Sequence, residues 1–285
     1  MVRKNFLLIS AVALFTLAFA APAADVVKPQ PGGNPAPKKD NFSQWPDFGE
    51  GQDWLYYGVD GNSGSVSVNG ALPFDNSTAE ITSGKELHFL QVYDVDFDEE
   101  YPAQYNNVFM IGFQGYTPNT ARDIIWNFDM KIEPGTYGTT GFIVERKDTF
   151  APDGTIAQPF NFFGVTYAGE ENYNAGLRCS SVVDFVPVLQ DLLVGVDPFA
   201  WNEYEIRFHL VDSETVLASI SVDGTEVCQT TLANYGETEV QLWLDNYKVT
   251  YDPLDPWSYS LGFNNKETPQ GVLFDNIQAK AKPVH

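Results

Sequence analysis

The segment that most constrains the fold begins at Asn202 and reads NEYEIRFHLVDSETVLASISVDGTEVCQTTL. Apolar residues alternate one by one with polar or charged residues over 204–210, and the alternation returns over 216–222. A period of two places the apolar side chains on one face of a strand and the polar ones on the other. The Asp223-Gly224 dipeptide that follows favours a tight antiparallel hairpin. The segment therefore predicts an antiparallel sheet with one face against a core.

Similar strand-like runs fill most of the chain. Tyr, Phe, Val and Thr dominate the stretches between clusters of Gly, Pro, Asn and Asp, which is typical of strands separated by turns. Helical periodicity is found only at 182–194, where Pro187 limits it to a turn or two. We predict an all-β, antiparallel sandwich or jelly roll with at most one or two short helical turns. Further strands are expected at 54–59, 65–68, 87–93, 108–113, 124–132, 141–145, 160–167 and 258–263.

The N-terminal region predicts export. Basic Arg3 and Lys4 precede an apolar run over 6–19, and small Ala-x-Ala sequences follow, as in a cleavable secretory signal. The run is short for a membrane span, although an uncleaved anchor is the alternative. The next residues are rich in Pro, Gly and Lys, which is typical of a disordered linker. We expect a signal peptide at 1–23, a linker at 24–44 and one sandwich domain at 45–285, in a secreted protein that is extracellular or periplasmic.

The chain is strongly acidic. Its formal charge is −22, and loss of Arg3 and Lys4 with the signal would change this by two, to −24. Such a surface repels phosphate backbones and anionic lipids, so we expect no nucleic-acid partner and no membrane insertion. Neutral or cationic ligands and metal ions fit the charge. Solubility alone also accounts for most of it.

The two cysteines of the chain are Cys179 and Cys228. In an exported protein a single disulfide between them is the simplest arrangement, with two free buried thiols as the alternative. Neither lies in a spacing or sequence context that suggests thiol chemistry.

Four motifs near the C-terminus occur in an order that resembles the concanavalin A-like lectin and glucanase group. They are WNEYEIRFHL, the hairpin segment LASISVDGTEV, LWLDNYKV and the closing FDNI. The resemblance covers the last third of the chain well and the first half only through its general β character. It implies a jelly roll of two large curved sheets, of which the concave one often binds carbohydrate, and it does not select one family within the group.

The first of two Asp-Asn pairs suggests a ligand site. If the strand has no bulge, Gln241, Trp243, Asp245 and Tyr247 share one face, and the leucines between them take the other. A sugar ring offers C–H groups to an aromatic ring and hydroxyls to carboxylates and amides, so this set predicts a carbohydrate site. The alternative is that Trp243 packs in a second core layer while Asp245 accepts a backbone hydrogen bond.

The second Asp-Asn pair suggests a structural role. With the same alternation, Asp275 lies among aliphatic residues, where its carboxylate needs hydrogen bonds or a cation. The resemblance implies a bound calcium ion, and the alternative is that Asp275 caps a neighbouring loop. Asp94, Asp96 and Asp98 form a second candidate calcium site, because oxygens at alternating positions can converge on a hard cation. This segment lacks the Gly and Glu of an EF-hand, so a solvated acidic loop is the alternative.

No catalytic pattern stands out. The Glu-x-Asp-x-x-Glu strand of glucanases is missing from the sequence, and the face shared by Glu205, Arg207 and His209 is typical of an exposed ladder with an ion pair. We therefore expect a non-catalytic, lectin-like protein that binds a polysaccharide or glycan on a concave sheet face. One alternative is a glycoside hydrolase or polysaccharide lyase that uses an acid such as Glu145 or Glu205. Another is a structural cell-surface or matrix protein without sugar binding.

Overall fold

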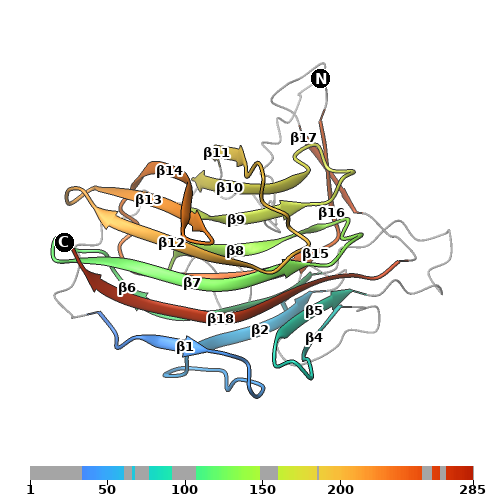
Figure 1. Ribbon diagram of the computed structural model, residues 1–285, viewed down its shortest axis with the longest axis horizontal. Coiled ribbons are helices and arrows are strands. Elements are labelled where there is room, and N and C mark those ends of the chain that lie inside the picture. Colours follow the sequence, from blue (N-terminus) through green and yellow to red (C-terminus); the bar gives the residue numbers. More distant parts are fainter. Residues whose placement is uncertain are drawn as a thin grey trace, which may run out of the picture.

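The computed structural model describes residues 34–60, 66–67, 77–91, 107–147, 160–184, 186–251, 259–263 and 268–284. Throughout these ranges the ordered elements are strands, and no helix is present (Figure 1). Every pairing between the named strands is antiparallel. The prediction of an all-β, antiparallel sandwich is confirmed.

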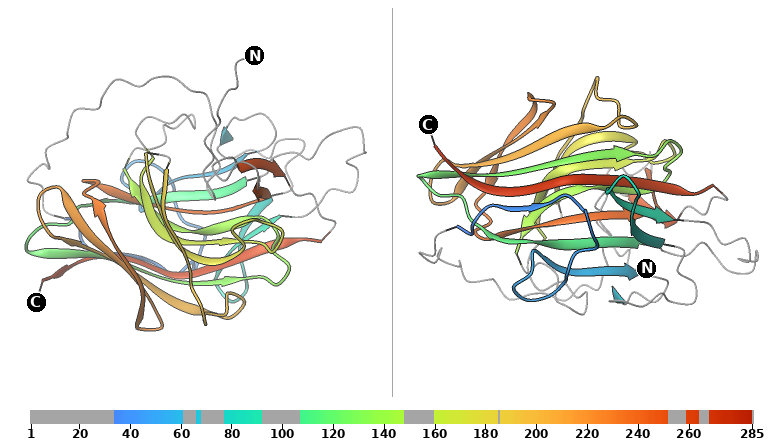
Figure 2. Two further views of the ribbon diagram at one scale, coloured as in Figure 1. Left: turned by 90° about the horizontal axis from the view of Figure 1, so that it is seen from above. Right: turned by 60° about the horizontal axis from the view of Figure 1, so that its bottom comes forward.

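Sheet A has eight strands, and its long strand β18 runs beside β7 and across the molecule (Figures 1 and 2). Its strand order is β14 (Thr225–Ala233), β13 (Thr215–Val222), β12 (Asn202–Leu210), β7 (Arg122–Ile132), β18 (Gln270–Pro283), β5 (Leu87–Gln91) and β4 (Ser77–Ile81), and β1 (Lys38–Asp40) also pairs with β18.

Sheet B has eight strands as well. Its order is β11 (Val186–Leu192), β10 (Gly176–Val183), β9 (Phe162–Ala168), β8 (Thr139–Arg146), β15 (Thr238–Asp245), β6 (Asn107–Tyr116), β2 (Trp54–Asp60) and β3 (Val66–Ser67). A separate two-stranded sheet pairs β16 (Tyr247–Tyr251) with β17 (Tyr259–Phe263).

The main core lies between sheets A and B and is rich in aromatic side chains. Phe128 of β7 stacks on Phe142 of β8 with the ring centroids 3.9 Å apart, so the two sheets are in direct contact. Tyr204 of β12, the register partner of Phe128, also stacks on it at a centroid distance of 4.9 Å. Burial of this many large side chains is the main stabilising contribution to a sandwich of this size.

The hairpin predicted at Asp223-Gly224 is present. Both residues have positive φ, 49° and 78°, which is the conformation that a tight two-residue turn requires. The turn joins β13 to β14, and Tyr204 to Leu210 of β12 pair with β13 in continuous register. The alternation in this segment therefore specifies its structure directly.

Two sequence predictions need correction. The segment expected to be helical contains β11, the edge strand of sheet B, where Pro187 is tolerated because an edge strand can leave one side of its backbone unpaired. The folded domain also begins before Trp45, since β1 pairs with β18 and Phe42 is fully buried. Tyr116 donates a hydrogen bond from its hydroxyl to the Ala36 carbonyl at 2.8 Å, which fixes part of the expected linker to the sandwich.

Candidate functional site

Strand β15 divides its side chains between two environments. Val240, Leu242 and Leu244 enter the core between the sheets. Alternation therefore turns Glu239, Gln241, Trp243 and Asp245 to the opposite side, which we call the outer face of sheet B. The grouping of Gln241, Trp243 and Asp245 agrees with the alternation read from the sequence.

Trp243 is fully buried on this outer face. It belongs to a second apolar cluster, and its indole Nε1 donates to the Thr139 hydroxyl at 3.1 Å. A Cβ at Gly141, the register partner on β8, would lie 2.8 Å from the indole ring, so the glycine makes room for it. In this arrangement Trp243 is a packing residue, and stacking on a sugar stays a prediction. The cluster consists of Phe109, Ile111, Ile143, Phe160, Phe162, Val182 and Trp243, with Leu55 packed against it.

Asp245 ends β15 and holds the neighbouring backbone. Its buried carboxylate accepts hydrogen bonds from the backbone N–H groups of Thr139 and Tyr247, each at 3.0 Å, and from the Thr139 hydroxyl at 2.8 and 2.9 Å. Burial raises the pKa of Asp245 to about 7, while these hydrogen bonds partly lower it. The contacts match the alternative in which Asp245 accepts backbone hydrogen bonds.

Tyr247 does not continue the row. Strand β15 stops at Asp245, and Tyr247 begins β16, which pairs with β17 in a different sheet. The prediction that Tyr247 shares the face of Trp243 assumed an unbroken strand, and that assumption is wrong because the chain leaves sheet B at Asn246.

Two glutamates that are far apart in the sequence meet on the outer face. Glu145 of β8 is the direct register partner of Glu239 of β15, and both side chains are fully buried. Side chains opposite each other in an antiparallel pair have Cβ atoms about 4.5–5.5 Å apart. From the sequence, Glu145 is one of two example acids, with Glu205, because nothing in either strand reveals its cross-strand partner.

The two carboxyl groups have different surroundings. Gln114 donates a hydrogen bond from Nε2 to Glu239 Oε2 at 2.7 Å. A register shift in β6 opposite Glu239, with positive φ at Phe113 and Gly115, brings Gln114 to this position. Both oxygens of Glu145 lack a partner. Burial, and next the nearby Glu239, raise the pKa of Glu145 well above its ordinary value.

Other buried acceptors on this face also lack a hydrogen bond. They are Gln241 Oε1 on β15 and Asn107 Oδ1 on β6, where Asn107 is the register partner of Asp245. Unpartnered buried polar atoms are rare in folded proteins, because each costs about 1–3 kcal/mol. Three adjacent strands, β6, β15 and β8, thus contribute acceptors that are suited to hydroxyl donors.

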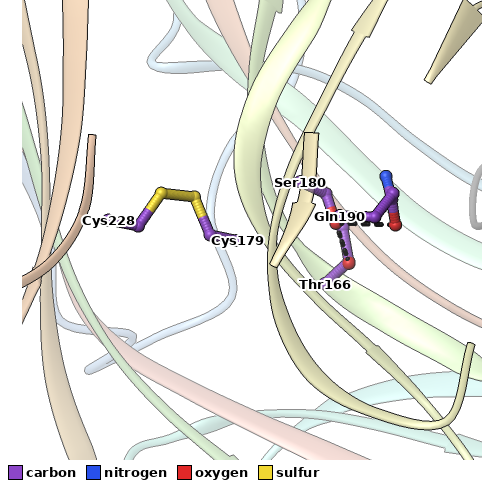
Figure 3. The surroundings of a disulfide bond; sticks show 5 residues. All are labelled: Thr166, Cys179, Ser180, Gln190 and Cys228. Atoms are coloured by element: carbon purple, nitrogen blue, oxygen red, sulfur yellow. Dashed lines mark hydrogen bonds between the residues drawn. A yellow bond between two sulfur atoms is a disulfide. The ribbon is translucent and has the colours of Figure 1, made fainter. Parts of the chain in front are cut away.

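Figure 3 shows the two faces of sheet B at β10. Cys179 points into the sandwich, where it forms a disulfide with Cys228 of sheet A across a Cα–Cα distance of 6.4 Å. The next residue, Ser180, points outward, and its hydroxyl lies 2.6 Å from that of Thr166 and donates to Gln190 Oε1 at 3.3 Å. The disulfide has the pairing expected from the sequence and links the two sheets.

The surroundings of Asp275 differ from the prediction. A bulge between Asp275 and Gln278, with Asn276 at a φ of 51°, breaks the alternation, so Phe274 and Ile277 both enter the core while Asp275 stays outside it. Its carboxylate accepts from Asn276 N at 2.7 Å and from Asn276 Nδ2 at 3.2 Å. Burial raises the pKa of Asp275, and the nearby Asp129 adds to the rise.

Calcium ligation stays a prediction. No group of three or more Asp, Glu, His or Cys side chains is arranged to hold a metal ion within the described ranges. Asp94, Asp96 and Asp98 lie outside those ranges. No helix in the described part of the chain is long and apolar enough to cross a membrane.

The charged row on β12 forms the predicted ladder. Arg207 donates to Glu205 at 2.9 Å, and Asp123 of β7 lies 2.8 Å from His209 Nδ1. This row is on the outer face of sheet A, and Arg207 lies within ion-pair distance of both Glu205 and Asp123.

Comparison with known proteins identifies the fold. An endo-β-galactosidase from Clostridium perfringens that releases GlcNAcα1-4Gal matches 92% of this chain and 66% of its own length, with a TM-score of 0.55 and 12% identity. The chain has the concanavalin A-like jelly-roll fold. A Bacillus licheniformis β-glucanase covers 89% of this chain and all of its own, at 15% identity and a TM-score of 0.49. The lectin UEA-II complexed with galactose covers 88% and 100%, at 8% identity and a TM-score of 0.45.

The sequence itself does not select a family. No protein-family model matches it, and a search of curated proteins also finds no match. A fold by itself does not determine an activity, because one fold can support many unrelated functions. The function therefore depends on the side chains of the site.

Proposed function

We propose that this protein binds a carbohydrate on the outer face of sheet B. The observation that carries the proposal is the set of unpartnered, buried acceptors of Glu145, Gln241 and Asn107 on three adjacent strands. Sugar hydroxyls are donors, and hydrogen bonds to ionised acceptors are stronger than neutral ones. The structural neighbours, which bind or act on saccharides, support a carbohydrate partner in general.

Burial affects how such a ligand would bind. Glu145 is fully buried, and Gln241 and Asn107 are almost completely buried, so a sugar reaches them only when neighbouring side chains move. We expect association to be slower than for a preformed open site, because a conformational change precedes full contact. The signal-like N-terminus suggests that this occurs outside the cytoplasm, in contact with extracellular or periplasmic glycans.

The test is electrophoresis of the mature protein through gels that contain different soluble polysaccharides. We expect one polymer to retard the protein and the Gln241→Leu variant to weaken retardation about tenfold, since the variant lacks the acceptor. Gln229→Leu, at an exposed position on β14, is the matched control and should behave like the wild type. If no polymer retards the protein, the carbohydrate proposal fails and a structural surface role becomes the better account.

A second function, glycosidic bond cleavage, is favoured by the Glu145–Glu239 pair. Glycosidases commonly use two carboxyl groups, one protonated and one ionised, and environments that separate their pKa values assign the roles. Glu145 would give its proton to the glycosidic oxygen as the C–O bond breaks, while the Glu239 carboxylate attacks the anomeric carbon and forms a covalent bond with it. Water would then release the sugar from Glu239 and give a proton back to Glu145.

Release of reducing ends from the retained polysaccharide separates cleavage from binding alone. If the protein is an enzyme, Glu145→Gln should abolish release while Glu205→Gln, on the outer face of sheet A, leaves it unchanged. If a polysaccharide retards the protein but no reducing ends are released, the cleavage proposal is wrong and the binding proposal still holds.

A further inference from the structure

The chemistry of the outer face of sheet B indicates which glycans it accepts. On β6, β15 and β8 the unpartnered buried atoms are all acceptors, from Asn107, Gln241 and Glu145. Two nearby donors are already used, since Gln114 Nε2 donates to Glu239 and the Trp243 indole donates to Thr139. An incoming group that brings donors is therefore matched better than one that brings acceptors.

The charge of this face leads to the same conclusion. Glu145 and Glu239 are opposed in register, and a proton shared by the two would still leave one negative charge. Arg178 of β10 does not neutralise them, because its guanidinium donates to the carbonyl groups of Asn174, Ala175 and Gln190 at 2.8–3.2 Å.

The other basic residues next to the pair are also directed elsewhere. Lys147 forms an ion pair with Glu237 at 2.8 Å. Arg146 follows Glu145 directly in β8, so the alternation of the strand turns its side chain to the other face. A carboxylate on a ligand would therefore meet like charge without a compensating cation from these strands.

We propose, on the basis of the proposed function, that the ligand is an uncharged, hydroxyl-rich glycan and that the juxtaposed Glu145 and Glu239 exclude polymers of uronic acids. The hydroxyls of a neutral glycan supply the missing donors. A uronate adds acceptors and negative charge at the same place, and like charges brought together at an interface oppose binding. The pair thus acts as a specificity determinant whether or not it also cleaves the bound chain.

The experiment compares affinities for a neutral and an acidic polymer with related backbones. Two pairs of polymers serve as probes. Soluble β-glucan is compared with β-1,4-glucuronan, and galactan is compared with polygalacturonate. Each polymer is titrated into the mature protein at constant ionic strength. We expect the preferred neutral polymer to bind at least about tenfold more tightly than its acidic counterpart. In the double variant Glu145→Gln with Glu239→Gln, this ratio should fall to about threefold or less.

The control separates a local effect from the overall acidity of the chain. Glu203→Gln with Glu205→Gln removes at least as many charges from β12 on the other sheet and should leave the ratio unchanged. Two results would overturn the inference while leaving glycan binding in place. One is that both double variants change the ratio of neutral to acidic affinity equally. The other is that a uronate polymer binds as tightly as a neutral one. If neither class of polymer binds, the proposed function itself fails. The single Glu145→Gln variant, with circular dichroism to check its fold, serves if the double variant does not fold.

Discussion

The outer faces of the two sheets differ although both arise from strands with alternating side chains. On sheet A, the partly exposed Glu205 and the nearly buried Asp123 both have Arg207 beside them, and Asp123 also contacts His209. On sheet B, Glu145 and Glu239 are fully buried, and both oxygens of Glu145 lack a partner. An acid beside a cation is ordinary in folded proteins, whereas a buried acid without a partner, such as Glu145, is costly and points to a function.

The largest expected effect comes from removing the indole at the centre of the outer cluster. Trp243→Ala should lower the free energy of unfolding by about 3–5 kcal/mol, because it leaves a large cavity in a fully packed region. Trp201→Ala, where the side chain is 42% exposed, should change it by less than about 1 kcal/mol. Urea denaturation measures both values, and equal effects would show that the face of Trp243 is open in solution.

The next effect is the dependence of stability on pH. Burial raises the pKa of Asp245 from 3.8 to about 7 in the folded protein, so folding favours the protonated acid. The stability that protonated Asp245 contributes is fully present below pH 4 and is lost as pH rises to about 7. Over this range the free energy of unfolding should fall by up to about 4 kcal/mol. Asp245→Asn keeps a carbonyl acceptor for Tyr247 and should flatten the curve over this range. Unchanged pH dependence in the variant would argue against a buried, titrating Asp245.

A smaller effect on the free energy of unfolding distinguishes the buried Glu145 from the partly exposed Glu205. Glu145→Gln should raise the free energy of unfolding by about 1–3 kcal/mol at high pH, since it removes a buried carboxyl group whose ionisation the folded state disfavours. Glu205→Gln should lower it by less than about 1 kcal/mol, because it only weakens an exposed ion pair. Chemical denaturation of both variants gives the comparison, and a destabilised Glu145→Gln protein would contradict it.

The smallest effect concerns Asp275. Asp275→Asn should change the free energy of unfolding by less than about 1 kcal/mol, because Asn276 supplies its hydrogen bonds and Asp129 only repels it. Thermal unfolding with calcium and with EDTA is the measurement. A calcium-dependent stabilisation that the variant loses would instead establish the calcium site expected from the family resemblance.

The sequence predicts the strands better than the site, for physical reasons. Alternation and turn chemistry are local, so the β12–β13 pairing and the Asp223-Gly224 hairpin can be read directly. The outward position of Trp243 follows from the same rule. Its burial does not, because that depends on Phe109, Phe160 and other residues from distant strands.

Bulges, strand ends and cross-strand partners explain why the other site residues were not placed correctly from the sequence. The extra residue at Asn276 reverses the alternation beyond it, and the break at Asn246 removes Tyr247 from the row. The Glu145–Glu239 pair exists only because β8 and β15 are neighbours in register, and single-strand patterns contain no information on that pairing.

The most direct test of the account is a crystal structure with an oligosaccharide of the retained polysaccharide. If the outer face of sheet B binds the glycan, sugar hydroxyls will lie within about 3 Å of Glu145, Gln241 and Asn107. A sugar bound instead on the outer face of sheet A, or one that leaves these three acceptors without a partner, would contradict it.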